Sequence, residues 1–253
     1  MIVKDEESFL EHALNSIKDV CDEIIIVDTG SKDDTKNIAK KYTKKVFNFR
    51  WKDDFSEARN FALKKATKSW ILILDADERI SKKDLKKIER LTKSKEFTGY
   101  SFIQRTYSKK KNGLKWNSAK NDGYKESEGF PGWNYRGITR LFKNDRKIKF
   151  NFAVHETVIG SIKKIDGMIK STGMPIHHFA ETKGKNFLYK KSKYYIKLLK
   201  KEVNKNPKAN LFFELGLEMK KTGKNAAKKY FSKAVGLDIN YKPLIEEIYS
   251  KKS

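Results

Sequence analysis

Two short stretches decide the fold, IIIVDTGS at residues 24–31 and WILILDADE at residues 70–78. Each is an apolar run that passes directly into carboxylates and turn residues. Such runs predict strands buried on both faces, as in a parallel sheet. In open α/β sheets, ligands bind beyond the carboxyl ends of the strands. We therefore expect Asp28 and the pair Asp75 and Asp77 to lie at one ligand site.

Apolar residues before and after these strands recur at the spacing of amphipathic helices. We expect helices in four places: over residues 9–17, after Ser31, over residues 55–66 and after Ser81. A short strand is expected at residues 45–47, and the spacing of Ser31 and Asp34 indicates a capping box. This alternation implies right-handed parallel crossovers, and thus the nucleotide-binding half of an α/β domain.

Beyond Phe97 the sequence alternates as antiparallel strands do. We expect strands at residues 100–105, 138–142 and 154–159, which would build the acceptor side of the same domain. Residues 108–137 are polar, glycine-rich and aromatic. A connection of this length is usually a lid or a binding loop.

After residue 182 the apolar spacing is helical. We therefore expect two domains, an α/β domain over residues 1–182 and an all-helical region over residues 183–253. The pattern around Phe212, Gly216 and Phe231 resembles a tetratricopeptide helix pair.

The chain is strongly basic, with 57 Lys and Arg against 32 Asp and Glu in 253 residues and a formal net charge of +25. Much of the excess lies in residues 182–253, which contain 19 lysines and six acids. This charge would attract polyanions such as an anionic membrane surface or a phosphorylated glycolipid. A purely solubilising role for the lysines is an equally open alternative.

The sequence lacks the patterns of membrane-spanning, secreted and disulfide-bonded proteins. No apolar stretch approaches the roughly 20 residues that span a bilayer, and no signal-peptide pattern occurs at the start. Cys21 is the only cysteine, which excludes an internal disulfide and a cysteine zinc site. The expected location is the cytoplasm, either free or bound peripherally to the cytosolic face of a membrane.

Four sequence blocks occur in a fixed order. They are MIVKDEE at 1–7, DTGS at 28–31 with Asp33 and Thr35, FSEARN at 55–60, and DADE at 75–78. In this order they resemble the successive blocks of family 2 glycosyltransferases. The resemblance covers residues 1–180 and implies the GT-A fold, in which a Rossmann-like nucleotide-binding half joins a mixed-sheet acceptor half. In that family the first strand has more apolar residues, so we expect a shortened edge of the nucleotide pocket.

The resemblance also implies a set of nucleotide contacts. Asp28 would accept the N3–H of uracil, and main-chain groups around Val3, Lys4 and Glu6 would line the base. Arg59 would contact the nucleotide. The alternatives are a turn-forming aspartate at position 28 and an ordinary helix-surface arginine at position 59.

Asp75 and Asp77, two residues apart, provide the oxygen ligands that a hard divalent cation prefers. We expect Asp77 to be the direct ligand, with Asp75 on the ribose or on metal-bound water. By resemblance, a late histidine supplies the third protein ligand, and His178 is the candidate from the pair His177-His178, for which packing is the alternative. Mn²⁺ or Mg²⁺ would neutralise the charge that builds up on a leaving diphosphate.

The acceptor hydroxyl must lose its proton to a carboxylate or histidine across the sugar from the leaving group. His155-Glu156 follows the apolar residues 152–154 on an expected strand, and with Val154 it is similar to Val-His-Glu blocks of the family. We assign the base to Glu156, and to His155 the orientation of Glu156 or of the acceptor. A strand-end salt bridge is the alternative. Arg136 and Arg140 are expected to hold phosphate or carboxylate.

The residues and the resemblance predict metal-dependent, inverting transfer of a sugar from a nucleoside diphosphate sugar, with UDP as the expected nucleotide, to a glycan or glycolipid. Inversion follows from a single base opposite the leaving group. The nearest enzymes in pattern extend lipopolysaccharide cores or cell-surface glycans. The alternative enzyme is a peptide glycosyltransferase that acts on oxygen or sulfur.

The alternative from another class is a nucleic-acid-binding or scaffold protein that uses the basic helices. The sequence contains no recognisable RNA-binding motif. We therefore expect no specific nucleic acid partner.

Overall fold

The computed structural model describes residues 1–111, 116–223 and 226–250. The chain divides into two units. The sheet unit comprises residues 1–151 and 155–180, and the helical unit comprises residues 152–154 and 181–253.

The first three strands form a small parallel sheet, as the alternation of strand and helix predicts. The strands pair in the order β1-β2-β3. The elements are β1 (Ile2–Val3), α1 (Leu10–Ile17), β2 (Ile26–Asp28), α2 (Thr35–Tyr42), β3 (Val46–Asn48) and α3 (Phe55–Leu63). Leu10, Leu14 and Ile38 pack with Val3 and Ile26, because helical spacing places the apolar side chains on the face turned to the sheet.

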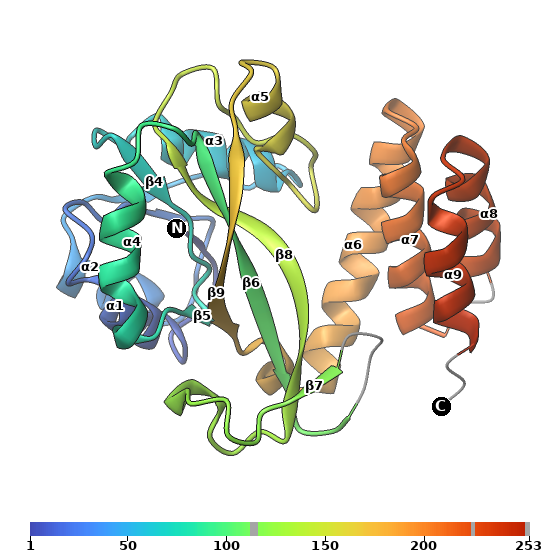
Figure 1. Ribbon diagram of the computed structural model, residues 1–253, viewed down its shortest axis with the longest axis horizontal. Coiled ribbons are helices and arrows are strands. Elements are labelled where there is room, and N and C mark those ends of the chain that lie inside the picture. The colour runs from blue at the N-terminus through green and yellow to red at the C-terminus, as the bar shows by residue number, and fades with distance from the viewer. Residues whose placement is uncertain (112–115, 224–225, 251–253) are drawn as a thin grey trace. The chain divides into compact units, whose positions relative to one another are not determined.

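A second, mixed sheet has six strands. Its order is β4-β8-β6-β9-β5, and β7 pairs with β8. The elements are β4 (Trp70–Leu72), β5 (Glu78–Arg79), α4 (Leu85–Thr92), β6 (Gly99–Ser108), β7 (Trp116–Ser118), β8 (Gly132–Lys143) and β9 (Ile169–His178). β6 runs antiparallel to β8 and parallel to β9, and these three long strands lie side by side (Figure 1). The predicted combination of a parallel half and a mixed-sheet half is confirmed.

The strand at Trp70 pairs differently from the prediction. The sequence predicts a parallel strand, whereas β4 pairs antiparallel with β8, with Trp70 opposite Lys143. β4 thus stands at the end of the second sheet, beside β8, whereas the parallel sheet is built from β1, β2 and β3. An apolar run buried on both faces does not encode the direction of its partner strand.

Residues 154–159 form a loop and the start of the short helix α5 (Ile159–Lys163), where the sequence predicts a strand. The backbone φ is +77° at Phe152 and +54° at His155, and both values lie outside the strand region. Val158 is fully buried. Its apolar side chain therefore anchors a loop instead of belonging to a strand.

The segment predicted as a lid, residues 108–137, is partly regular. It contains β7, a 3₁₀ turn at Lys125–Ser127 and the first residues of β8. Arg105 of β6 fixes this segment through an ion pair with Asp122 at 3.2 Å. Residues 112–115 of the predicted lid lie outside the described residues.

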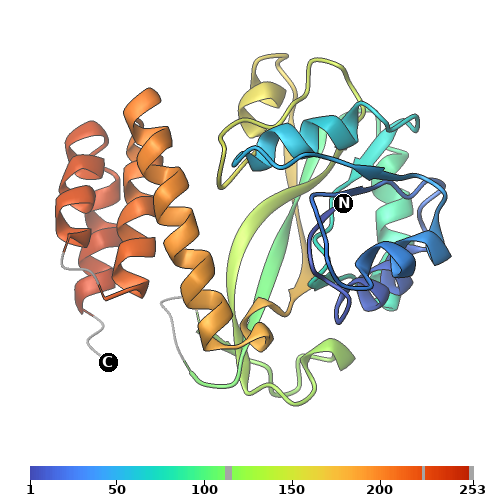
Figure 2. The same ribbon diagram turned by 180° about the vertical axis from the view of Figure 1, so that it is seen from behind.

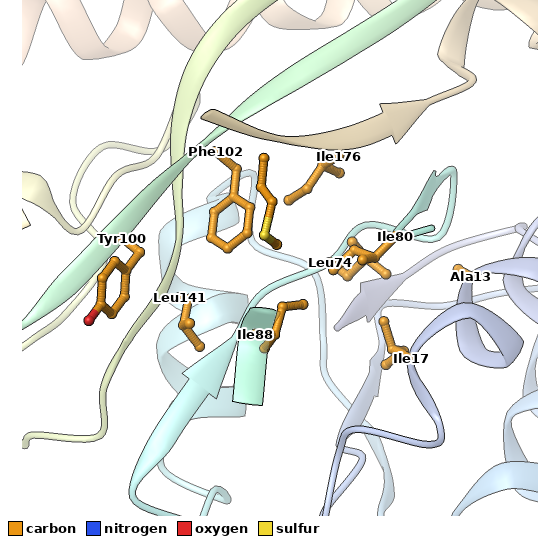
Figure 3. Close-up of a cluster of buried hydrophobic side chains, with 10 residues drawn as sticks. Ala13, Ile17, Leu74, Ile80, Ile88, Tyr100, Phe102, Leu141 and Ile176 are labelled. Carbon is orange, nitrogen blue, oxygen red and sulfur yellow. The ribbon is translucent and has the colours of Figure 1, made fainter. Parts of the chain in front are cut away.

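A hydrophobic core anchors both ends of the acidic loop that follows β4. Leu74, before the loop, and Ile80, after it, are buried and belong to one cluster with Phe102 of β6 and Ile176 of β9 (Figure 3). Ile88 of α4 covers the same core. Burial of each such side chain contributes about 1.5–3 kcal/mol, so the position of the loop is set by packing.

The helical unit has the helices that the apolar spacing predicts. They are α6 (Lys185–Lys205), α7 (Ala209–Lys221), α8 (Ala227–Leu237) and α9 (Tyr241–Ser250). α6 and α7 lie side by side in both views (Figure 1, Figure 2). Gly216 lets α7 approach α8, because a Cβ there would lie 2.5 Å from a ring carbon of Phe231. The likeness to a tetratricopeptide pair stays a prediction.

Within residues 1–111, 116–223 and 226–250, no helix has both the length and the apolar character that crossing a bilayer requires.

Candidate active site

The acidic loop after β4 is closed by the side chain of Glu78. The Asp75 N–H donates to Oε2 of Glu78 at 2.9 Å, and the Glu78 N–H donates to the Asp75 carbonyl at 3.0 Å. Glu78 is fully buried, and its Oε1 accepts from Arg140 and from Gln104. A buried carboxylate thus fixes the backbone of the loop that carries Asp75 and Asp77.

Two arginines neutralise Asp75. Arg59 of α3 donates from Nη2 to Oδ1 of Asp75 at 2.7 Å, and Arg140 of β8 donates from Nη2 to Oδ2 at 2.8 Å. Burial raises the pKa of Asp75, but Arg140 and Arg59 outweigh burial and hold that pKa well below its usual range. Arg140 also donates to Glu78 at 2.7 Å. Arg140 therefore holds carboxylates, which is one of the two roles expected for it.

Arg59 links the acidic loop to a second carboxylate. Its Nε pairs with Oε1 of Glu156, while its Nη2 holds Asp75. The residue is 5% exposed, so the alternative of an ordinary helix-surface arginine is wrong. Burial lowers the pKa of Arg59, and the carboxylates of Asp75 and Glu156 outweigh burial and raise it. Within the described residues, Nη1 of Arg59 is buried without a hydrogen-bond partner.

The predicted base, Glu156, lies in a loop, whereas the sequence places it on a strand. Its side chain is 12% exposed, and it reaches the acidic loop through the guanidinium of Arg59, which is 97 residues away in sequence. His155, predicted to orient Glu156, has a left-handed backbone conformation. The structure therefore brings Glu156 and Asp75 onto one arginine. The role of Glu156 as a base stays a prediction.

Two of the three predicted metal ligands face each other. Nε2 of His178 lies 3.6 Å from Oδ1 of Asp77. Ligands at about 2.0–2.2 Å from a cation lie about 3–4 Å from each other, so this pair fits one divalent cation. The hydroxyl of Thr106 lies 2.9 Å from Nδ1 of His178. Such a partner on the second ring nitrogen orients a ligating histidine.

Asp75 does not join this pair, because both of its oxygens are held by arginines. Over residues 1–111, 116–223 and 226–250, no three His, Cys, Asp or Glu side chains are arranged to hold a metal. The other positions around a cation would fall to water and to substrate oxygens, as is usual for Mg²⁺.

Two guanidinium groups and several carboxylates lie close together here. Arg59 pairs with Asp75 and Glu156, and Arg140 pairs with Asp75 and Glu78.

His177, beside the candidate ligand His178, has a packing role. It is fully buried, its Nδ1 lies 2.7 Å from the hydroxyl of Tyr107, and its ring stacks on the ring of Tyr107. Burial, helped by the charge of Arg105, lowers the pKa of His177 to about 3. The ring is therefore neutral at neutral pH. The packing alternative holds for His177 and leaves His178 as the metal candidate.

Asp28, the predicted uracil partner, ends β2 and is buried. Its Oδ1 accepts from the N–H of Gly30 at 2.9 Å and from that of Ser31 at 3.1 Å, and Lys36 lies 3.5 Å away. These are the contacts of a turn-forming aspartate. A contact with a nucleotide base stays a prediction.

Hydrogen bonds join the loops that follow β1 and β2. The hydroxyl of Ser31 accepts from the Asp5 N–H at 3.0 Å, and that of Thr35 accepts from the Glu6 N–H at 2.7 Å. Ser31 is thus committed to the neighbouring loop. The predicted capping box with Asp34 is wrong for this reason, and the N-cap of α2 forms without a side-chain hydrogen bond.

Val3 and Lys4 precede this junction. The Val3 carbonyl accepts from both the N–H and the hydroxyl of Thr29, at 3.0 and 3.1 Å. Lys4 is exposed. Contacts of Val3, Lys4 and Glu6 with a base stay predictions.

Three residues that shape the site are absent from the sequence prediction: Glu78, Gln104 and Thr106. Alternate residues of a strand share a face, so Phe102, Gln104 and Thr106 of β6 point the same way. Phe102 and Gln104 are both buried. A buried strand face that changes from aromatic to polar residues indicates that the polar residues have polar partners. This change along β6 is the sequence signal that points to Gln104 and Thr106.

Comparisons with known proteins identify the family of the chain. Residues 1–167 match the family model described as Glycosyl transferase family 2. The chain is 28% identical to the SPbeta prophage-derived glycosyltransferase SunS of Bacillus subtilis, over 96% of the chain and 53% of SunS. It is 33% identical to a TPR repeat-containing protein of Synechococcus elongatus, over 64% of the chain and 35% of that protein. The chain thus spans between a third and about half of the length of these relatives.

Solved structures of TarS from S. aureus share the fold. The complex with UDP-GlcNAc has a TM-score of 0.51 at 16% identity, over 87% of this chain and 70% of that chain. The complex with UDP has a TM-score of 0.52 at 15% identity, over 91% of this chain and 72% of that chain. At these identities the likeness concerns the fold alone, and the fold is the GT-A fold predicted from the sequence.

Proposed function

Because the chain belongs to glycosyl transferase family 2, we propose that it transfers a sugar from a nucleoside diphosphate sugar to an acceptor hydroxyl. The observation that carries the proposal is the ion pairing of Arg59 with both Asp75 and Glu156. Asp75 lies in the same acidic loop as Asp77, which faces His178. The residues proposed to bind a cation and the proposed base are thus linked through one loop and one arginine. Buried charges are costly to maintain.

UDP is the proposed nucleotide. Among the described residues, the hydrogen bond to Oδ2 of Asp28 comes from the Ser31 N–H at 3.4 Å, whereas Oδ1 accepts two shorter ones. Oδ2 therefore keeps acceptor capacity for the N3–H of a uracil. The TarS structures that share this fold contain UDP and UDP-GlcNAc, which supports the choice.

Asp28→Asn is expected to weaken UDP binding while the turn stays intact. Asparagine keeps one oxygen for the Gly30 N–H but replaces the second acceptor by an amide donor. A hydrogen bond to a charged group contributes about 1.5–3 kcal/mol, so the Kd for UDP should rise by roughly 10–100-fold in calorimetry. Asp28→Ala should lose UDP affinity as well and also melt at a lower temperature. Tighter binding of GDP or dTDP than of UDP by the native chain contradicts the assignment.

A divalent cation is the proposed cofactor, with Asp77 and His178 as its protein ligands. Bound there, Mn²⁺ or Mg²⁺ supplies Lewis-acid stabilisation of the leaving diphosphate. Thr106 fixes the ring of His178, and Arg59 and Arg140 keep Asp75 neutralised. Of the two aspartates in the loop, Asp77 is therefore the one proposed to bind the cation.

Glu156 is the proposed base. The acceptor oxygen forms a bond to the anomeric carbon as its proton passes to Glu156, and the bond to the diphosphate breaks with its electron pair on the phosphate oxygen. Oε1 of Glu156 is occupied by Arg59, so Oε2 is the oxygen that takes the proton. One base across the sugar from the leaving group implies inversion of configuration.

A glycan or glycolipid is the proposed acceptor, and the basic helices are proposed to hold the protein at an anionic membrane surface. α6 contains many lysines and a single acid, Glu202. Phe187 and Tyr189 on this helix are 43% and 46% exposed. Exposed aromatic residues among lysines suit the interface of an anionic bilayer.

Sedimentation with lipid vesicles tests the membrane contact. At low salt the protein should sediment with vesicles that contain anionic lipid but not with neutral vesicles, and high salt should release it because salt screens the lysines. The double substitution Phe187→Ser and Tyr189→Ser should reduce binding, whereas Leu237→Ser, at an exposed position on α8, should not. No sedimentation at low salt means that the lysines serve only solubility.

A further inference from the structure

We propose that Arg59 is the positioning residue that holds Glu156 in place against the acidic loop, a role that replaces the nucleotide contact expected for it. The inference rests on the proposed function, in which Glu156 is the base. It adds a physical link between the base and the loop that carries the cation ligand.

The guanidinium of Arg59 is divided between the two carboxylates. Nε pairs with Glu156 and Nη2 holds Asp75 at 2.7 Å. The planar guanidinium fixes the directions of its N–H groups, so the positions of the two carboxylates relative to each other are set by one rigid group. The Arg59 side chain is 6% exposed, which leaves it little freedom to change partners.

The helix that carries Arg59 is also clamped to the segment before Glu156. Asn60 donates from Nδ2 to the Phe150 carbonyl at 3.0 Å and accepts from the Phe150 N–H at 2.8 Å. The Arg59 guanidinium lies over the Phe150 ring, 5.6 Å from its centroid. Two successive residues of α3 therefore bind the chain that leads to the base.

Glu156 needs such support because its own segment is irregular. The segment is closed by an isolated bridge between Asn151 and Thr157, and φ is positive at Phe152 and at His155. A strand ladder therefore does not set the position of Glu156. A general base acts only within hydrogen-bond reach of its proton, and a displacement of about 1 Å can cost about 10²-fold in rate.

Burial and existing partners leave Arg59 poorly suited to bind a nucleotide. Nη1, which has no hydrogen-bond partner among the described residues, is buried, so a diphosphate would reach the guanidinium only if the group turned. Turning would take it away from Glu156, which is 12% exposed, and the cost of leaving that carboxylate unpaired opposes the exchange. Loss of Arg59 should therefore act on turnover and not on the affinity for UDP.

A double-mutant cycle between Arg59→Lys and Glu156→Gln tests the link. Lysine keeps the positive charge but has no fork to hold two carboxylates. Alone, Arg59→Lys should lower kcat by roughly 10–100-fold and change the Kd for UDP by less than about threefold. In the Glu156→Gln background, the same substitution should lower kcat by less than about threefold, because the group that it positions no longer accepts a proton.

Arg140→Lys is the matched control. Arg140 binds Asp75 and Glu78 but not Glu156. Its effect on kcat should therefore be the same in both backgrounds, which separates a general disturbance of the loop from the positioning of Glu156. If circular dichroism shows that Arg59→Lys does not fold, Asn60→Ala takes its place, because the loss of Asn60 loosens the same segment. Asn60→Ala should then lower kcat in the native background and have little effect on kcat in the Glu156→Gln background.

Two results overturn the inference. A Kd for UDP that rises at least tenfold with Arg59→Lys in both backgrounds makes Arg59 a nucleotide contact, and additive losses of kcat remove the link to Glu156. Both results presuppose turnover by the native chain. If the native chain with Mn²⁺ transfers or hydrolyses none of the UDP-sugars, the proposed function fails, and the inference fails with it.

Discussion

Glu156→Gln is expected to lower kcat by about 10²–10⁴-fold, because glutamine cannot accept the proton of the acceptor hydroxyl. The amide oxygen still accepts from Arg59, so the loop should keep its position. The affinity for UDP and for the cation should barely change, since the base acts across the sugar from the diphosphate. Turnover, Kd for UDP and Tm should be measured on one preparation.

The competing explanation treats Glu156 as a structural salt bridge. In that case Glu156→Gln would lower Tm and keep most of its turnover per folded molecule. Asp145→Asn is a suitable control, because the Asp145 carboxylate accepts from the Lys147 N–H in an exposed turn. Activity of Glu156→Gln within a few-fold of native would move the base to His155.

Asp77→Asn is expected to remove the effect of metal on UDP binding. Lewis-acid interactions contribute several kcal/mol, so affinity for UDP with Mn²⁺ should fall by more than about 100-fold. The main-chain hydrogen bond from the Phe179 N–H to the Asp77 carbonyl, at 2.9 Å, is kept in the variant, which should retain the native fold. Calorimetry with UDP and Mn²⁺ measures the loss directly.

Neighbouring histidines provide the control for this experiment. His178→Gln should reduce the response to Mn²⁺, because His178 faces Asp77. His177→Gln should leave that response unchanged, because the His177 ring bonds and stacks on Tyr107. Unchanged metal-dependent affinity in Asp77→Asn contradicts the ligand assignment.

The sequence predicted the parallel half of the fold well, because its pattern is local. Leu10, Leu14 and Ile38 recur at helical spacing beside strands that end in turn residues, and they pack as expected. The partner of β4 was not predictable, because an apolar run such as 71–74 is compatible with parallel and antiparallel neighbours. The loop around Glu156 is not predictable from the sequence, because Phe152 and Val154 are typical strand residues and no sequence pattern marks the positive φ of a non-glycine residue such as His155.

The sequence identifies which residues belong to the candidate site but not which of them contact each other. Asp75, Asp77, Arg59 and Glu156 belong to recognisable blocks. Their pairing depends on tertiary structure, which brings Arg59 to a carboxylate 97 residues away. Asp75 was expected beside the cation or ribose, and two arginines hold it instead.

Titration of UDP into the native chain with Mn²⁺, and again with a chelator, is the sharpest test of a metal-dependent UDP site in this protein. We expect saturable binding of UDP that is strong with Mn²⁺, more than about 100-fold weaker in the chelator, and weaker for GDP in both conditions. UDP binding that is equal with and without the cation would contradict the metal site. No binding of any nucleoside diphosphate would contradict the proposed function itself.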